Sequence, residues 1–123
     1  MQALVIDDSR VMRKLLGGML GQFGFEVAEA GNGVEGLQRL GAGPLPNVAL
    51  VDWNMPEMDG VEMIRAVRGR RDWDQLRVLM VSSETSPGQV AQALAAGADE
   101  YLMKPFTADS LRAKLEMLGL VSY

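Results

Sequence analysis

The chain has 123 residues, about the length of one domain, of which 48% are hydrophobic and 23% charged, as is usual for globular proteins. Its formal net charge of −4 argues against a general nucleic-acid binder, which needs a basic surface to displace counterions from phosphates. The absence of Cys and His excludes disulfides, zinc ribbons, thiol catalysis and a phosphohistidine intermediate. With no targeting or membrane segment in the sequence, we expect a monomeric cytoplasmic protein.

Five short apolar runs alternate with helical patterns along the chain. The runs predict strands at residues 3–6, 25–30, 48–51, 78–81 and 101–103. Strands that are apolar throughout are typical of a parallel sheet covered on both faces. The run at 25–30 differs, because Glu26 and Glu29 alternate with apolar residues, and it predicts a half-exposed edge strand.

Apolar residues spaced three and four apart predict a helix after each strand. Ser9, Asp59 and Ser86 are the expected N-caps of the first, third and fourth helices, and Pro87 suits the first position of the fourth. The apolar positions are Met12, Leu15, Leu16, Met19, Leu20 and Phe23 in the first helix, Val34, Leu37 and Leu40 in the second, Val61, Ile64 and Val67 in the third, and Leu111, Leu115 and Leu118 in the last. Five successive strand–helix units predict one α/β domain, residues 1–123, with right-handed crossovers and no output domain.

Polar residues follow four of the five predicted strands. Asp7 and Asp8 follow the first, Asp52 the third, Ser82 the fourth and Lys104 the fifth. Ligands of open α/β sheets bind beyond the carboxyl ends of the strands, so these groups are expected to converge there. Three close carboxylates repel one another unless a cation is bound, and ligands that are all oxygen favour a hard cation such as Mg²⁺. A metal, an ammonium and a hydroxyl together suit phosphoryl transfer, with a carboxylate as the nucleophile.

Each of these residues also has an ordinary structural explanation. Asp7 and Asp8 can favour a helix dipole, Ser82 can bond a backbone group, and Lys104 can be a solvated charge. Their joint placement, each at the carboxyl end of its own strand, is what favours a functional site.

Four segments carry a resemblance to a known family. They are residues 5–10 (VIDDSR), 51–60 (VDWNMPEMDG), 78–84 (VLMVSSE) and 97–107 (GADEYLMKPFT). In this order and spacing they resemble the receiver domains of two-component response regulators, especially the single-domain chemotaxis members, over essentially the whole chain. The resemblance implies a flavodoxin-like (βα)5 three-layer sandwich with a parallel sheet in the order 2-1-3-4-5.

The resemblance also implies roles for the residues at the carboxyl ends of the strands. Asp52 would be the phosphoacceptor, Asp8 a direct Mg²⁺ ligand and Asp7 a ligand largely through water, with Asp52 itself and the backbone carbonyl of Asn54 completing the metal site. Lys104 would pair with a phosphoryl oxygen, and its bond to the following proline is usually cis in the family.

A second set of roles concerns switching and the lifetime of the phosphorylated form. Ser82 would hold a phosphoryl oxygen and move together with Tyr101, the aromatic switch residue. Asn54 and Glu84 would tune the attack of water on the acyl phosphate, and the pair found here predicts a short-lived mark. The expected contacts with a downstream partner, on the face of the fourth helix, fifth strand and fifth helix, are Val90, Tyr101, Met103 and Lys114.

We therefore expect a stand-alone response regulator that takes its phosphoryl group from a histidine kinase and catalyses only its own phosphoryl transfer and dephosphorylation. A phosphate sink for a kinase remains an alternative output. A Mg²⁺ phosphohydrolase of the haloacid dehalogenase type is a second class, but it normally has Asp where this chain has Asn54. A flavodoxin-like electron carrier is a third, but its flavin phosphate needs hydroxyl and glycine donors where Asp7 and Asp8 stand.

Overall fold

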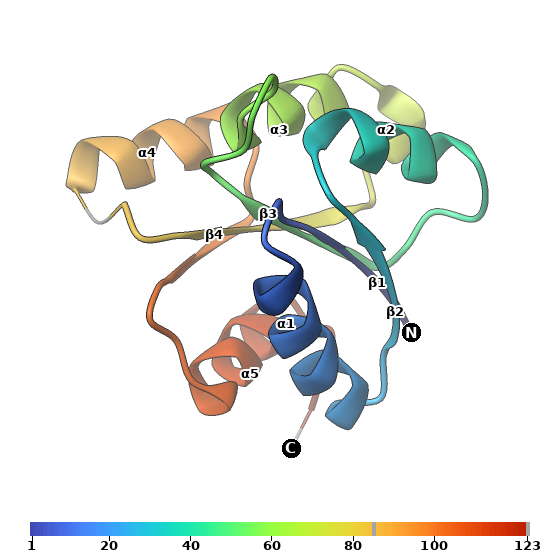
Figure 1. Cartoon of the computed structure of the whole chain (residues 1–123), viewed down its shortest axis with the longest axis vertical. Coiled ribbons are helices and arrows are strands. Elements are labelled where there is room, and N and C mark those ends of the chain that lie inside the picture. The colour runs from blue at the N-terminus through green and yellow to red at the C-terminus, as the bar shows by residue number, and fades with distance from the viewer. Residues whose placement is uncertain (85, 123) are drawn as a thin grey trace.

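Five parallel strands form one sheet in the computed structural model, which describes residues 1–84 and 86–122. The elements follow one another as β1 (Gln2–Ile6), α1 (Arg10–Gln22), β2 (Glu26–Ala30), α2 (Gly33–Gly41), β3 (Val48–Asp52), α3 (Gly60–Arg68), the short 3-10 helix η1 (Arg71–Trp73), β4 (Arg77–Ser82), α4 (Pro87–Ala96), β5 (Glu100–Met103) and α5 (Ala108–Met117). The strand order is β2-β1-β3-β4-β5, as expected. Helices α1 and α5 cover one face of the sheet and α2, α3 and α4 the other (Figure 1).

Burial follows the position of each strand in the sheet. Every residue of the central strand β3 is buried, because helices cover both of its faces. The edge strand β2 is only partly buried and alternates along its length, which confirms the prediction for this run. Pairing of β1 with β3 aligns Ile6 with Val51, and pairing of β4 with β5 aligns Ser82 with Met103. The residues that follow these strands therefore lie together, at the carboxyl ends of the strands.

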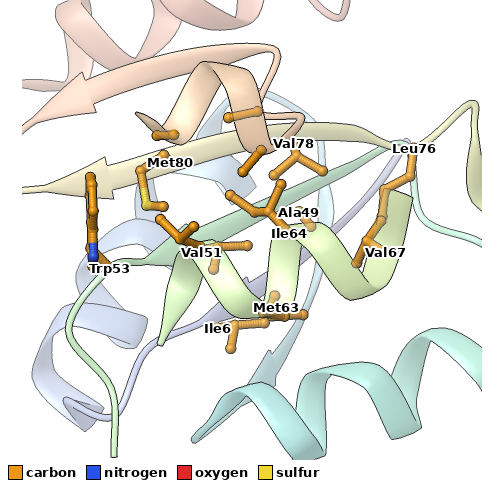
Figure 2. Packing of buried hydrophobic residues seen from close by; sticks show 14 of the residues in the cluster. Ile6, Ala49, Val51, Trp53, Met63, Ile64, Val67, Leu76, Val78 and Met80 are labelled. Carbon is orange, nitrogen blue, oxygen red and sulfur yellow. The ribbon is translucent and has the colours of Figure 1, made fainter. Parts of the chain in front are cut away.

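Two apolar clusters hold the layers together, one on each face of the sheet. Figure 2 shows the cluster under α3, where Met63 and Ile64 pack against Ile6, Val51 and Met80 of the sheet. The cluster on the other face joins β1, β3 and β4 to the helices α1 and α5, through residues that include Val5, Leu16, Leu20, Leu50, Leu79, Leu111 and Leu115. Each fully buried side chain of this size stabilises the fold by roughly 1.5–3 kcal/mol.

The helix starts match the predicted caps. The side chains of Ser9, Asp59 and Ser86 each accept a backbone N–H from the first turn of their helices, and Pro87 begins α4. Helix α4 ends before Gly97, whose φ of 122° suits only glycine.

Sequence reasoning had no cap for the second or fifth helix. Asn32 caps α2, and Thr107 caps α5 in a reciprocal arrangement with Ser110. Leu15 and Val34, both part of the predicted apolar patterns, are exposed. None of the described helices has the length and apolar character that a bilayer crossing would require.

Candidate functional site

Three carboxylates converge beyond the carboxyl ends of β1 and β3. Asp7, Asp8 and Asp52 each offer an oxygen, and these oxygens lie within 4.8 Å of one another. They meet because β1 and β3 are neighbours in register, so the residues that end them are side by side. Asp7 and Asp52 are buried, with 2% and 6% of their surface exposed, whereas Asp8 is exposed. The convergence predicted from the sequence is therefore confirmed.

Lys104 brings the positive charge to this cluster. Its Nζ donates a hydrogen bond to Asp52 Oδ1 at 3.0 Å and lies 3.7 Å from Asp7 Oδ2. The backbone N–H of Lys104 donates to the carbonyl of Ser82 at 2.8 Å, which fixes the start of the side chain. The Lys104–Pro105 peptide bond is cis, as the resemblance implied. One ammonium thus faces two buried carboxylates and bonds one of them.

Burial shifts the pKa values of the two inner carboxylates, Asp7 and Asp52. Desolvation raises the pKa of Asp52, and the hydrogen bond from Lys104 opposes this only in part. Desolvation also raises the pKa of Asp7, against the hydrogen bond that Oδ1 accepts from the Ser9 N–H. Asp7 Oδ2 is buried and has no hydrogen-bond partner among the described residues. An unpartnered buried carboxylate oxygen beside two further carboxylates suits a hard cation.

Ser82 is connected to Tyr101 through the backbone of one residue. The Ser82 hydroxyl oxygen accepts the N–H of Glu84 at 3.0 Å, and the carbonyl of Glu84 accepts the Tyr101 hydroxyl at 2.5 Å. Ser82 is fully buried and Tyr101 is 5% exposed, so the ring points into the protein. Ser82 and Tyr101 are therefore joined by two hydrogen bonds through the Glu84 backbone. Sequence reasoning paired Ser82 with Tyr101 but missed this backbone link.

Asn54 and Trp53 follow Asp52 directly along the chain and differ in burial. Asn54 is exposed two residues beyond Asp52, and the intervening Trp53 is buried. Trp53 lies on the same side of the sheet as Met80 in the apolar cluster of Figure 2.

The four expected partner contacts differ in exposure. Met103 is exposed, Val90 is half-buried, and half-buried Lys114 donates to Glu100 Oε1 at 2.9 Å. Tyr101 is buried in this structure, so its side chain is not at the surface.

Two residues near the acidic cluster were not singled out by sequence reasoning. Arg13 Nη1 donates to the backbone carbonyl of Asp7 at 2.7 Å. Gly60, at the start of α3, lies so close to the Asp52 carbonyl that an added Cβ would overlap it. The sequence signal for Gly60 is its place just after the Asp59 cap. The close approach of Gly60 to the end of β3 depends on tertiary packing, which the sequence does not show.

Three acidic residues, two of them buried, and one lysine therefore meet at the carboxyl ends of the strands of a doubly wound parallel sheet. A profile of the response regulator receiver domain matches residues 3–116. The chain belongs to the response regulator receiver domain family, and with it to two-component signalling.

Named relatives are similar over nearly all of the chain. The chemotaxis protein CheY1 of Helicobacter pylori strain J99 is 39% identical over 119 residues, which are 96% of this chain and 96% of that protein. The chemotaxis protein CheY of Pseudomonas aeruginosa is also 39% identical over 119 residues, 96% of this chain and 95% of that protein. The solved structure of Vibrio cholerae CheY4 superposes with a TM-score of 0.87 at 34% identity, covering 94% of this chain and 96% of that one. The chain is thus a CheY-like receiver domain.

Proposed function

We propose that this receiver domain accepts a phosphoryl group on Asp52 from a histidine kinase or phosphotransfer protein, with Mg²⁺ bound beside it, and then changes the face formed by α4, β5 and α5. One observation carries the proposal. The Lys104 ammonium bonds the buried Asp52 carboxylate at 3.0 Å while a second buried carboxylate, that of Asp7, keeps an oxygen without a hydrogen-bond partner among the described residues.

The donor set fits Mg²⁺. Asp7, Asp8 and Asp52 supply carboxylate oxygens, and the backbone carbonyl of Asn54 would complete the protein ligands. When bound, Mg²⁺ would neutralise the charge of a phosphoryl group and of the carboxylates that approach it.

Phosphoryl transfer at this site needs few parts from the chain. A carboxylate oxygen of Asp52 attacks phosphorus, the P–N bond to the donor imidazole breaks, and an acyl phosphate forms. Lys104, whose Nζ bonds Asp52 Oδ1 at 3.0 Å, would pair with one phosphoryl oxygen, and the Ser82 hydroxyl would donate to another. Attack of water on phosphorus then releases inorganic phosphate and restores the carboxylate, with Asn54 and Glu84 tuning the rate.

The response to phosphorylation would pass from Ser82 to Tyr101. A Ser82 hydroxyl drawn toward phosphoryl oxygens would pull on the Glu84 backbone, which also accepts the Tyr101 hydroxyl. The mark would bias an equilibrium between existing conformers of the β4–α4 loop. Met103, Val90 and Lys114 would then carry the contact with a downstream protein. The relatives are named as chemotaxis proteins, and binding a partner or draining phosphate from a kinase are both outputs open to this chain.

Tryptophan fluorescence tests the proposal, because Trp53 follows Asp52 directly and is 8% exposed. A Trp73→Phe variant leaves Trp53 as the only tryptophan of the 123 residues. We expect its emission to change with Mg²⁺ and again with beryllofluoride, a mimic of the acyl phosphate. The matched control adds Asp52→Asn and should lose the response to beryllofluoride. No response to either ligand, or an equal response in the control, would show that Asp52 is not the phosphoacceptor.

A phosphate-release assay separates this proposal from a phosphohydrolase. A receiver domain consumes one acyl or amido phosphate donor for each cycle of its own modification, so release should stop in Asp52→Asn. Turnover of unrelated phosphate monoesters would favour the haloacid dehalogenase type instead, although Asn54 lacks the acid that such enzymes use.

A further inference from the structure

Arg13 connects helix α1 to the backbone of the acidic cluster. Its Nη1 donates to the carbonyl of Asp7 at 2.7 Å, and its Nε donates to Glu29 Oε1 at 3.0 Å. The side chain of Arg13 is 18% exposed and that of Glu29 26%, so the pair is largely shielded from water. The planar guanidinium presents these donors in a fixed fork, which a lysine cannot reproduce.

The backbone of Asp7 is therefore held on both sides. Its N–H donates to the carbonyl of Ala30 at 3.1 Å, and its carbonyl accepts from Arg13. Its Oδ1 accepts the N–H of Ser9 at 2.8 Å. With three contacts fixing the residue, the remaining oxygen, Oδ2, stays buried beside Lys104.

We propose that Arg13, braced by Glu29, is a positioning residue for the cation site: it fixes Asp7 so that Oδ2 is held ready for a divalent cation. This inference rests on the proposed function, because it assumes that Asp7 takes part in binding Mg²⁺. Partners that hold metal ligands from behind typically contribute 10–100-fold to metal affinity.

The sign of the effect separates position from charge. Removing a positive charge close to three carboxylates would by itself strengthen the binding of a cation. Releasing the Asp7 backbone would weaken it, because the ligand must be ordered again when the metal binds. A weaker Mg²⁺ affinity in an Arg13 variant therefore reports on position and not on charge.

Lys14 offers a matched control one residue away. Its Nζ bonds the same carboxylate, at 2.7 Å from Glu29 Oε2, and no hydrogen bond or ion pair joins its side chain to Asp7 among the described residues. Lys14→Met thus removes one positive charge and one ion pair of Glu29, as Arg13→Met does, but leaves the Asp7 carbonyl bonded. The two variants differ in the contact that the proposal concerns.

The first measurement is Mg²⁺ affinity by calorimetric titration of the purified chain. We expect the dissociation constant to rise about tenfold in Arg13→Met and to change by less than about twofold in Lys14→Met. If Arg13→Met does not fold, Arg13→Gln replaces it, since its shorter side chain cannot reach both groups. Wild-type or tighter affinity in the folded Arg13 variant, or an equal loss in Lys14→Met, would overturn the proposal.

The second measurement needs no metal. The Ser9 amide donates to Asp7 Oδ1, so its hydrogen exchange reports whether Asp7 stays in place. We expect faster Ser9 exchange in Arg13→Met than in Lys14→Met, with the α5 amides unchanged as an internal reference, and equal Ser9 rates would overturn the proposal. If the wild-type chain bound no Mg²⁺ while Ser9 exchange still distinguished the variants, the proposed Mg²⁺ site would be wrong. The conclusion that Arg13 fixes the position of Asp7 would still be supported.

Discussion

Replacing Asp7 by asparagine is expected to stabilise the folded protein in the absence of divalent cations. The change keeps the shape of the side chain, and its amide oxygen can still accept the Ser9 N–H. It removes a buried charge whose Oδ2 lacks a hydrogen-bond partner among the described residues. An unsatisfied buried group costs about 1–3 kcal/mol when neutral and more when charged, so exchanging the charged oxygen for a neutral amide should raise the free energy of unfolding by about 1 kcal/mol at pH 7.

The gain must depend on pH, because burial raises the pKa of Asp7 in the folded state. A carboxyl group with a raised pKa stabilises the fold fully below its unfolded pKa, near 3.8, and loses that contribution as the pH rises through the folded pKa. Between the two values the limiting slope is about 1.4 kcal/mol per pH unit. The amide of the Asp7→Asn variant does not titrate, so the variant and the wild type should diverge with rising pH and converge toward pH 4.

Urea unfolding in EDTA over this pH range measures the difference, with Asp8→Asn as the control. Asp8 is exposed, and its replacement should change the free energy of unfolding by less than about 0.5 kcal/mol. Mg²⁺ at a hundred times its dissociation constant should stabilise the wild type by about 2.7 kcal/mol and the Asp7→Asn variant by less. The reasoning would be refuted if Asp7→Asn were no more stable than the wild type at pH 7, or if its extra stability were equally large at pH 4.

Three further changes probe the same loops. Lys104→Ala should still accept a phosphoryl group but switch poorly, because the phosphoryl oxygen that Lys104 would hold is left free. The partner affinity of the phosphorylated variant measures this, and normal switching would show that the response does not need Lys104. Glu57 has a φ of 69°, a left-handed conformation that Asn tolerates better than Glu and that Val tolerates worse. In thermal unfolding, Glu57→Asn should therefore be more stable than the wild type by about 0.5–1 kcal/mol and Glu57→Val less stable. The reverse order would show that backbone strain at Glu57 does not limit stability. Gly60→Ala should lower the free energy of unfolding by about 1–3 kcal/mol and weaken Mg²⁺ binding, because the added methyl overlaps the Asp52 carbonyl. Unchanged Mg²⁺ affinity would show that the loop adapts to the methyl group.

The order of strands and helices could be predicted because burial leaves a direct trace in sequence. The residues of β3 are apolar throughout until the terminal Asp52, and the alternation before Ala30 marks an edge strand. Helix starts were also predictable where a short polar residue precedes an apolar period, as at Ser9 and Asp59. Exposure within a helix was harder: Leu15 belongs to an apolar period, but 47% of it is exposed. A period identifies an apolar face, and its width depends on what packs against it.

The members of the acidic cluster could be predicted, but their different environments could not. Sequence places Asp7 and Asp8 side by side, and only packing decides that Asp7 is buried and Asp8 exposed. The links made by Arg13 and by the backbone of Glu84 are also tertiary, because each joins groups whose distance along the chain carries no periodic signal. Backbone carbonyls are identical at every residue, so a sequence does not indicate which of them a side chain will reach.

Charge at the carboxyl ends of the strands predicts that the proposed phosphorylation of Asp52 needs a metal. Three carboxylates and the Lys104 ammonium leave a formal net charge of −2 around the buried Asp7 and Asp52. A phosphoryl group on Asp52 replaces one negative charge with about −1.5 to −2, which increases the excess by up to about one unit. A divalent cation more than offsets that increase, whereas Lys104 is already bonded to Asp52. Phosphorylation in excess EDTA should therefore be far slower than with Mg²⁺, and equal rates would mean that the chain's own charges suffice.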